Sequence, residues 1–235
     1  VEAKKYIGFL PQKAPLHTEM TVDEYLYHCA DIRLMPKKEI PAAIDRAKEK
    51  CGITHFSKRQ ICNLSGGYQQ RVGIAQAIIH DPLFVILDEP TNGLDPNQIT
   101  EVRHLIKGIA EDRAVLISTH ILPEVQAVCD YIMMIEHGQK VFEGTINAFN
   151  TYMSPSALMT IMHNAPTTEE LLKIEGIVRV ERLTKTRIRL HFKGDNAIVG
   201  RVVKQAVENQ WHLREISLEK ESLDKVFAKL SGKEV

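Results

Sequence analysis

The sequence lacks the features that mark disulfide-rich, membrane-spanning and nucleic-acid-coating proteins. Its four cysteines, Cys29, Cys51, Cys62 and Cys129, show no CxxC spacing, which is typical of reduced cytosolic thiols. The longest run of aliphatic or aromatic side chains, Leu83–Leu87, has five residues, far fewer than the roughly 20 that a membrane span requires. Basic and acidic side chains are equal at 30 each, so no positive excess attracts nucleic acid.

Strand-like and helix-like segments alternate over the first 145 residues. Short apolar runs predict strands at residues 6–10, 82–90 and 114–120. Helical periodicity and capping residues predict helices at residues 22–35, 42–53, 68–80, 97–112 and 122–132. A hairpin is expected at residues 132–144, turning near His137 and Gly138. Because strands alternate with helices, the sequence predicts an α/β core with a mostly parallel sheet.

The composition changes near residue 150, and a different order of elements follows. The patterns predict strand, helix, strand, strand, helix and strand at residues 157–163, 167–174, 176–184, 186–193, 197–210 and 211–219. This order is typical of a ferredoxin-like α+β domain. A last helix is expected at residues 222–230. We therefore expect two domains, residues 1–148 and 154–235, with their boundary at Thr145–Ser154.

Two acidic residues end the most apolar of the predicted strands. Asp88 and Glu89 are neighbours, and neighbours on a strand point to opposite faces, which excludes a facing pair of the glycosidase kind. We expect Asp88 to hold a metal ion and Glu89, just past the strand end, to polarise a water molecule. The carboxyl end of a parallel strand is where open α/β sheets bind ligands. The alternative is that these acids serve only as turn or helix-capping residues.

Three other polar residues lie where predicted elements end. Gln12 follows the first strand, and its amide can meet a metal-bound or attacking water. His120 follows a buried strand and could donate a hydrogen bond to a phosphoryl oxygen. Asp95 precedes Pro96 at the start of a helix. The structural alternatives are a solvated loop glutamine, a structural histidine and a turn aspartate.

A serine and two glycines, Ser65, Gly66 and Gly67, directly precede a helix-forming run. Adjacent glycines are costly inside regular elements and favour places where the backbone must approach something closely. A helix N-terminus presents unpaired N–H groups and the positive end of the helix dipole, so the expected guest is an anion such as phosphate.

Five short motifs, in this order, resemble those of the ATP-binding-cassette (ABC) ATPases over residues 5–145. The stretch "FLPQ" is similar to the Q-loop, "LSGGYQQR" to the signature loop, "FVILDEP" to the Walker B strand, "NGLDP" to the D-loop and "ISTH" to the switch histidine. Tyr68 stands where the common signature has glutamine, and this variant is similar to ABC-2-type export ATPases. The tail at residues 216–232 resembles the same subgroup.

The resemblance implies two ABC ATPase subunits paired head to tail, with ATP and Mg²⁺ between them. It makes Glu89 the general base, with His120 on the γ-phosphate and Gln12 as its sensor. Asp88, together with Gln12, is implied on Mg²⁺. The residues implied to contact the nucleotide across the interface are Ser65, Gly66, Gly67, Tyr68, Gln69 and Asp95.

The motif that cradles phosphate in such proteins, G-x-x-x-x-G-K-[ST], does not occur in these 235 residues. Gly232-Lys233 is followed by Glu234. By family order the motif would precede the Q-loop, so we expect an N-terminally truncated cassette, an incomplete P-loop ATPase core without measurable ATP turnover. Uncovered apolar faces of the strands at 82–90 and 114–120 are expected to promote self-association.

The function implied for the intact protein is the ATP-hydrolysing subunit of an ABC-2-type membrane exporter. Its partners would be a second ATPase subunit and a transmembrane permease, docked by a helical subdomain at about residues 21–80, and nucleic acid is not expected. The resemblance implies a cytoplasmic location, peripheral on the inner face of the cell membrane. The alternatives are a soluble ABC ATPase of DNA repair or translation, and a non-enzymatic regulatory module.

A basic face is expected on one strand of the C-terminal domain. Arg187, Arg189, His191 and Lys193 alternate with apolar residues, and residues 179–204 contain eight lysines and arginines against two acids. Such a face could contact nucleic acid, anionic lipid or an acidic partner, but a solvated sheet face is the favoured interpretation. A regulatory or dimerising appendage is the next choice.

Overall fold

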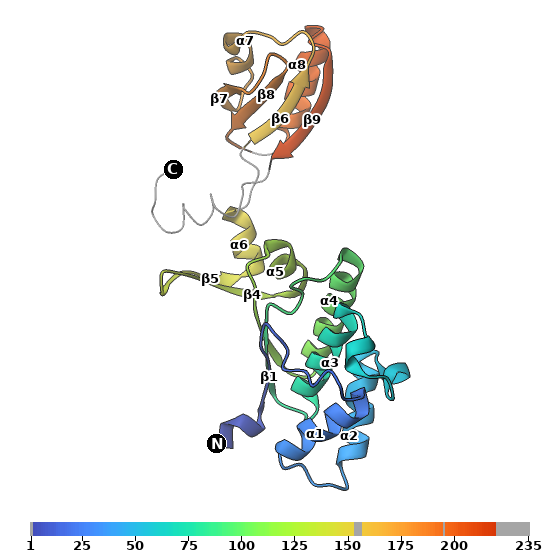
Figure 1. Cartoon of the computed structure of the whole chain (residues 1–235). Coiled ribbons are helices and arrows are strands. Elements are labelled where there is room, and N and C mark those ends of the chain that lie inside the picture. The colour runs from blue at the N-terminus through green and yellow to red at the C-terminus, as the bar shows by residue number, and fades with distance from the viewer. Residues whose placement is uncertain (1, 153–156, 195, 220–235) are drawn as a thin grey trace. The chain divides into compact units, whose positions relative to one another are not determined.

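The chain folds into two compact units, residues 1–129 and 130–235, in a computed structural model that describes residues 2–152, 157–194 and 196–219 (Figure 1). Both predicted domain limits, 148 and 154, fall within the second unit. Packing alone does not define a functional domain, so these limits stay a prediction. None of the helices in the described residues is long and apolar enough to cross a membrane.

The first unit is built on a parallel three-stranded sheet in the order β1-β2-β3. Its strands are β1 (Ile7–Leu10), β2 (Phe84–Asp88) and β3 (Ala114–Ser118). All three were predicted, and their parallel pairing confirms the α/β class. Since the strands run the same way, the segments that follow Leu10, Asp88 and Ser118 all start at one edge of the sheet.

The helices of the first unit are α1 (Val22–Ile32), α2 (Ile40–Cys51), α3 (Gly66–Ile78), α4 (Pro96–Ala110) and α5 (Leu122–Val128), with short 3₁₀ turns η1 (Glu2–Lys5), η2 (Thr54–Phe56) and η3 (Ile61–Asn63). Of these, α3 packs against β1 and β2, and α4 packs against β3, on one side of the sheet in Figure 1. Local signals in the sequence explain several bounds. Thr21 and Glu24 form the expected capping box of α1, and Gly52 ends α2 with a φ of 65°.

The helix α3 lies unusually close to β1. A Cβ atom at Gly8 would collide with the backbone oxygen of Ala77, and one at Gly73 would lie 2.8 Å from a methyl of Leu10. The Gln76 side chain donates a 2.8 Å hydrogen bond from Nε2 to the Phe9 carbonyl oxygen. Glycine at positions 8 and 73 therefore sets the distance between this helix and the sheet.

The second unit begins with a two-stranded hairpin, β4 (Tyr131–Glu136) and β5 (Gln139–Thr145). It turns at His137 and Gly138, whose φ angles are 48° and 77°, as the two-residue turns that match strand twist require. The hairpin and its turn were predicted. The helix α6 (Ile146–Tyr152) was not, because the sequence analysis treated this segment as a boundary.

A four-stranded antiparallel sheet in the order β7-β8-β6-β9 follows the hairpin. The elements are β6 (Ala157–Met162), α7 (Thr168–Leu172), β7 (Ile177–Arg182), β8 (Arg187–Phe192), α8 (Ile198–Glu208) and β9 (Leu213–Glu219). This order confirms the ferredoxin-like arrangement. Trp211 is buried in its core. The helix predicted at 222–230 lies outside the described residues.

The expected basic face of β8 is present, but an acidic partner holds its central residue. Arg189 forms two hydrogen bonds of 2.6 and 2.9 Å with the carboxylate of Glu219 on β9, and a third of 3.1 Å with Glu181 on β7. Because β6 lies between β8 and β9, the Arg189 side chain crosses over that strand. These ion pairs favour the interpretation of a solvated structural face over a nucleic-acid site.

The side of the first sheet away from the helices carries partly exposed apolar residues. Phe9, Ile86 and Leu116 are paired side by side across the three strands, and Phe9 and Leu116 are 47% and 48% exposed. Their neighbours along the strands, such as Val85 and Leu87, are fully buried on the other side. An apolar row of this kind favours association between copies of the chain.

We predict that the 235-residue chain self-associates through this row. Replacing both Phe9 and Leu116 by serine is expected to shift light-scattering mass toward the monomer, because the change removes exposed apolar area without touching the buried core. The matched control is serine at Leu83, which is 67% exposed before β2 and outside the row. An unchanged mass for the double variant contradicts the prediction.

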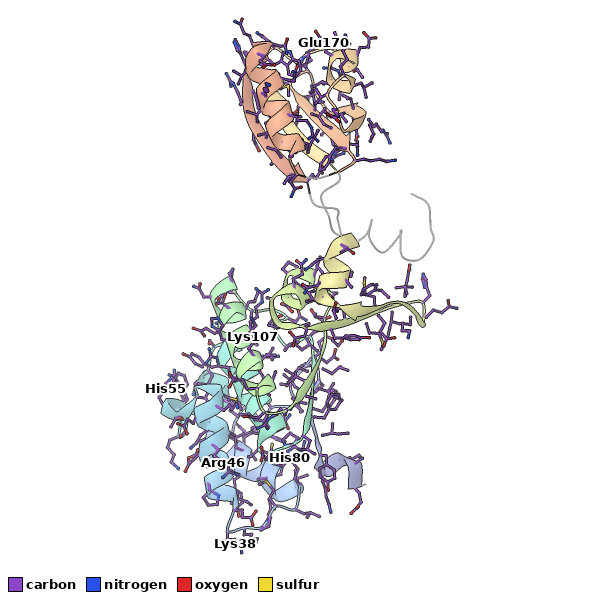
Figure 2. The ribbon with its side chains drawn as sticks, turned by 180° about the vertical axis from the view of Figure 1, so that it is seen from behind. Lys38, Arg46, His55, His80, Lys107 and Glu170 are labelled. Atoms are coloured by element: carbon purple, nitrogen blue, oxygen red, sulfur yellow. The ribbon has the colours of Figure 1, made fainter. Side chains whose placement is uncertain are left out.

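A partly buried histidine follows α3 on the opposite edge of this sheet. Arg33 Nη1 lies 2.9 Å from His80 Nε2, and the Nδ1 atom of His80 is buried without a hydrogen-bond partner among the described residues (Figure 2). Burial, assisted by the Arg33 charge, lowers the pKa of His80 from 6.5 to about 4. Between pH 6.5 and pH 4, His80 binds a proton in the unfolded chain but not in the folded chain. The free energy of unfolding therefore decreases as the pH falls through this range.

We predict that the His80→Gln variant loses less stability than the wild type between pH 7 and pH 4.5. The difference is expected to be about 1–3 kcal/mol in the free energy of unfolding, since one pKa unit corresponds to about 1.4 kcal/mol. Urea denaturation at both pH values measures it. An equal loss in the two proteins would show that His80 takes its proton in the folded state at its ordinary pKa.

Candidate functional site

The residues singled out around Glu89 come together where β2 and β3 end. Asp88 is the last residue of β2 and pairs in register with Ser118, the last residue of β3. The Glu89 N–H donates a 2.8 Å hydrogen bond to the Ser118 carbonyl oxygen, which continues the pairing by one residue. Thr119 and His120 then follow directly. Parallel pairing thus brings residues 30 positions apart in sequence into contact.

The central contact of the site joins Glu89 and His120. His120 Nδ1 lies 2.8 Å from Glu89 Oε1, with the glutamate side chain 15% exposed and the histidine 74% exposed. The hydrogen bond to the Glu89 carboxylate, together with its charge, raises the pKa of His120 above 6.5. Within this pair the glutamate is fixed at the protein surface, and the histidine reaches out into solvent.

Glu89 adopts a backbone conformation that is rare for its residue type. Its φ is 45°, in the left-handed region where residues with a Cβ are uncommon. Such conformations cost of order 1–3 kcal/mol and are found preferentially at functional sites. At this residue the chain turns away from β2. The side chain of Glu89 therefore does not follow the alternation between the two faces of the strand that determines the direction of Asp88.

Three residues that the sequence analysis did not single out surround this pair. The buried carboxylate of Glu124, on α5, accepts hydrogen bonds from the hydroxyls of Thr91 and Thr119. Thr119 Oγ1 also lies 3.3 Å from Glu89 Oε2. Glu124 is 2% exposed, the lowest exposure of any acidic side chain in the described residues. A charged residue in a short helix gives no periodic signal of burial. Only the position of Glu124 soon after the "ISTH" motif could have indicated that it belongs to the site.

The serine and glycines form the open N-terminus of α3. Ser65 is the N-cap residue, but its side chain makes no capping hydrogen bond. A Cβ atom at Gly66 would meet nothing within 4 Å, whereas one at Gly67 would lie 2.6 Å from the side chain of Gln98 on α4. The first turn of α3 is therefore open to a ligand at Gly66, whereas a side chain at Gly67 would require the Gln98 side chain to move.

Tyr68 and Gln69, expected to contact a nucleotide, pack within the first unit. The ring of Tyr68 meets Phe56 edge to face at 4.6 Å between centroids. Gln69 Nε2 donates hydrogen bonds of 3.2 and 3.1 Å to the carbonyl oxygens of Ile61 and Leu64. In this state of the chain both side chains hold the loop that leads into α3, and their contact with a nucleotide stays a prediction.

Asp95 is the N-cap residue of α4. Its Oδ1 atom accepts 3.0 Å hydrogen bonds from the N–H groups of Asn97 and Gln98. The structural alternative expected from the sequence was a turn aspartate, and the structure shows a helix cap instead, a role that needs no ligand. Because Gln98 also lies against Gly67, the N-termini of α3 and α4 adjoin each other. The implied contact of Asp95 with a nucleotide across an interface stays a prediction.

Gln12 and Asp88 lie at the same edge of the sheet as Glu89. Gln12 is exposed in the loop after β1, and Asp88 is partly exposed at the end of β2. Among the described residues, no group of three histidine, cysteine or acidic side chains could hold a metal ion alone. Mg²⁺ bound with a nucleotide takes only one or two carboxylates and keeps waters and phosphate oxygens, so the hard oxygen donors of Asp88 and Gln12 suit it.

Comparisons with known proteins agree with this geometry. The sequence profile described as ABC transporter matches residues 1–92. The bacitracin transport ATP-binding protein BcrA of Bacillus licheniformis is 30% identical over 98% of this chain and 74% of its own length. This chain belongs to the ABC transporter ATP-binding proteins. The sequence prediction of the family is thereby confirmed.

Two other similar proteins show what share of a related protein's length this chain matches. The Nod factor export ATP-binding protein I of Rhizobium meliloti is 37% identical over 60% of this chain and 43% of its own length. The solved structure of CbiO1 from Clostridium perfringens, part of the ABC transporter complex CbiONQ, has a TM-score of 0.57 and 27% identity, covering 63% of this chain and 60% of that one. The chain spans about half the length of other curated relatives, 48% in one case.

We predict that the Glu89→Gln variant lowers the pKa of His120 toward 6.5, because it removes the carboxylate that stabilises the imidazolium. The charged pair is present at low pH and is lost as the pH rises through the raised pKa of His120. Imidazole NMR titration measures this, with the signal assigned through a His120→Gln variant. The matched control is Glu111→Gln, an exposed glutamate at the end of α4. An unaltered His120 pKa in Glu89→Gln would refute the contact.

Proposed function

We propose that this chain forms the catalytic part of the ATP-hydrolysing subunit of an ABC-2-type membrane exporter. The observation that supports this most is the fixed pair of Glu89 and His120 at the carboxyl edge of a parallel sheet, where ligands of open α/β sheets bind. The strained backbone of Glu89 is a second support, since strain of this kind favours a functional over a structural acid.

Glu89 is proposed to act as the general base. Its Oε1 atom contacts His120 and its Oε2 atom faces Thr119, so the carboxylate is oriented before any substrate arrives. A carboxylate oriented in this way can take a proton from a water that attacks phosphorus, as general-base catalysis requires. His120, largely exposed and charged below its raised pKa, would donate a hydrogen bond to a phosphoryl oxygen.

Asp88 and Gln12 would hold Mg²⁺ beside this pair through their side-chain oxygens and through water. When bound with ATP, Mg²⁺ neutralises charge on the phosphate oxygens and orients them. The residues of this chain then have to exclude other water molecules from the site and hold the attacking water molecule in position. Positioning of that kind, with electrostatic stabilisation, supplies most of the rate in phosphoryl transfer.

The open first turn of α3 is proposed to bind the γ-phosphate of a nucleotide held by a second subunit. Ser65 makes no capping bond of its own, and Gly66 offers backbone with free space around it. The N–H groups of the first turn, which have no partner within the helix, and the positive end of the helix dipole favour an anion at this position. A head-to-tail pair would close on the nucleotide through this contact, and loss of the γ-phosphate would reopen it.

An export role is proposed from the relatives. BcrA is named for bacitracin transport and the Rhizobium protein for Nod factor export. A permease partner, and with it a peripheral position on the inner face of the membrane, follows from the proposal, because an exporter's ATPase must act on a membrane channel. A soluble ABC ATPase of DNA repair or translation is the second candidate, and co-purification with a permease distinguishes the two. The intact pair of Glu89 and His120 disfavours a regulatory module without catalysis.

We predict that the 235 residues alone do not hydrolyse ATP, because they contain no Gly-Lys-Ser or Gly-Lys-Thr sequence to hold the phosphates. A longer protein that joins a phosphate loop to this chain is expected to hydrolyse ATP, and Glu89→Gln in it to lower turnover by about 100-fold or more. Phosphate release measures both, with Glu111→Gln as the control.

Two results would contradict these expectations separately. Saturable, Glu89-dependent ATP turnover by the 235 residues would show that a phosphate loop is not needed. Normal turnover of Glu89→Gln in the longer protein would show that another group is the base.

A further inference from the structure

A buried carboxylate joins the two loops that carry the proposed catalytic pair. Glu124 accepts a hydrogen bond from Thr91, two residues after Glu89, on its Oε1 atom. Its Oε2 atom accepts a 3.1 Å hydrogen bond from Thr119, the residue before His120. A glutamate that is 2% exposed must satisfy its charge inside the protein, and these two hydroxyls are the donors that the structure provides.

The Thr119 hydroxyl lies between two carboxylates. Its oxygen is 3.1 Å from Glu124 Oε2 and 3.3 Å from Glu89 Oε2, and it accepts a 3.1 Å hydrogen bond from the N–H of Ile121. A hydroxyl has a single proton to donate, so only one of the two carboxylates receives it at any time. The contact therefore ties the state of Glu89 to that of Glu124.

We infer that Glu124 is a positioning residue: through its two threonine donors it fixes the loops that carry Glu89 and His120. The pair forms between the ends of separate strands, and α5 supplies the only side chain in the described residues that bonds to both loops through their threonines. Without Glu124 the loop after β2 and the loop after β3 are joined by fewer hydrogen bonds, and the exposed ring of His120 is less often at 2.8 Å from Glu89.

The inference rests on the proposed function, in which Glu89 and His120 act together on water and phosphate. The inference adds that a residue on a third element, α5, fixes the distance between Glu89 and His120. When the Thr119 proton points to Glu124, the Oε2 atom of Glu89 loses a hydrogen-bond donor and becomes more basic. When the proton points to Glu89, that oxygen accepts a hydrogen bond on one of its two lone pairs and becomes less basic. Thr119 and Glu124 together thus regulate the basic oxygen of the proposed base.

A double-mutant cycle on the 235-residue chain tests the inference without ATP. The pKa of His120 is titrated by imidazole NMR in the wild type, Glu89→Gln, Glu124→Gln and the double variant. The charge of Glu124 acts on His120 whichever residue occupies position 89, so it cancels in the comparison, and the remaining difference reports the contact. The drop in pKa caused by Glu89→Gln is expected to shrink to less than half in the Glu124→Gln background.

Controls separate positioning from charge and from misfolding. Glu111→Gln, the same charge change on an exposed residue, is expected to leave the full drop in place. In the Thr119→Val background, which lacks the shared proton, Glu89→Gln is expected to leave the pKa of His120 nearly unchanged. In the Thr119→Ser background, which keeps the hydroxyl, Glu89→Gln is expected to lower the pKa of His120 as it does in the wild type. If Glu124→Gln fails to unfold cooperatively, the two Thr119 variants decide.

The inference is overturned if Glu89→Gln lowers the pKa of His120 equally in the wild type, in Glu124→Gln and in Thr119→Val. That result would leave the proposed ATPase function standing, since the cycle uses no nucleotide. Loss of turnover in the longer protein, with the coupling intact, would instead refute the function and spare the positioning role.

Discussion

The parallel pairing of β2 with β3 is the constraint on which the site depends. It extends one residue past the strands through the hydrogen bond from the Glu89 N–H to the Ser118 carbonyl. That single bond fixes where the chain leaves each strand, and so where Glu89 and His120 meet. A shift of register by one residue would place Asp88, not Glu89, beside the histidine, and would send both side chains to the wrong face.

Each of two buried charges in the first unit is satisfied by hydrogen-bond partners. Lys48 is 5% exposed, and its ammonium lies 2.7 Å from Asp23 and 2.9 Å from the hydroxyl of Ser57. Glu124 is satisfied in the same manner by two threonines. Removing one partner of a buried ion pair such as that of Lys48 typically costs about 3–5 kcal/mol, because one charge is then left uncompensated. The first ties α1 to α2, and the second ties the loops of the site.

Much of the fold was predictable because its signals are local. The capping box of α1, the glycine that ends α2 and the turn at His137 and Gly138 all act within four residues of sequence. The ferredoxin-like order followed from periodicity alone. The helix α6 (Ile146–Tyr152) was missed because the change of composition in this segment was interpreted as a domain boundary.

The site was predictable as a set of motifs and less so as a set of contacts. Glu89 and His120 were expected at one edge, and the structure places them 2.8 Å apart. The capping role of Asp95 and the loop-holding role of Gln69 depend on backbone groups that no motif names. The contacts of Glu124 could not be predicted, because its partners lie 33 and 5 residues away and only the folded chain makes them neighbours.

The close fit of α3 against β1 has a mechanical consequence. Gly8 beneath Ala77, Gly73 beneath Leu10 and the Gln76 bond to Phe9 fasten the helix to the strand at successive heights. The helix cannot slide or roll on the sheet without a clash. We therefore expect a force on the first turn of α3 at Gly66 to be transmitted to β1 and to the loop that follows it.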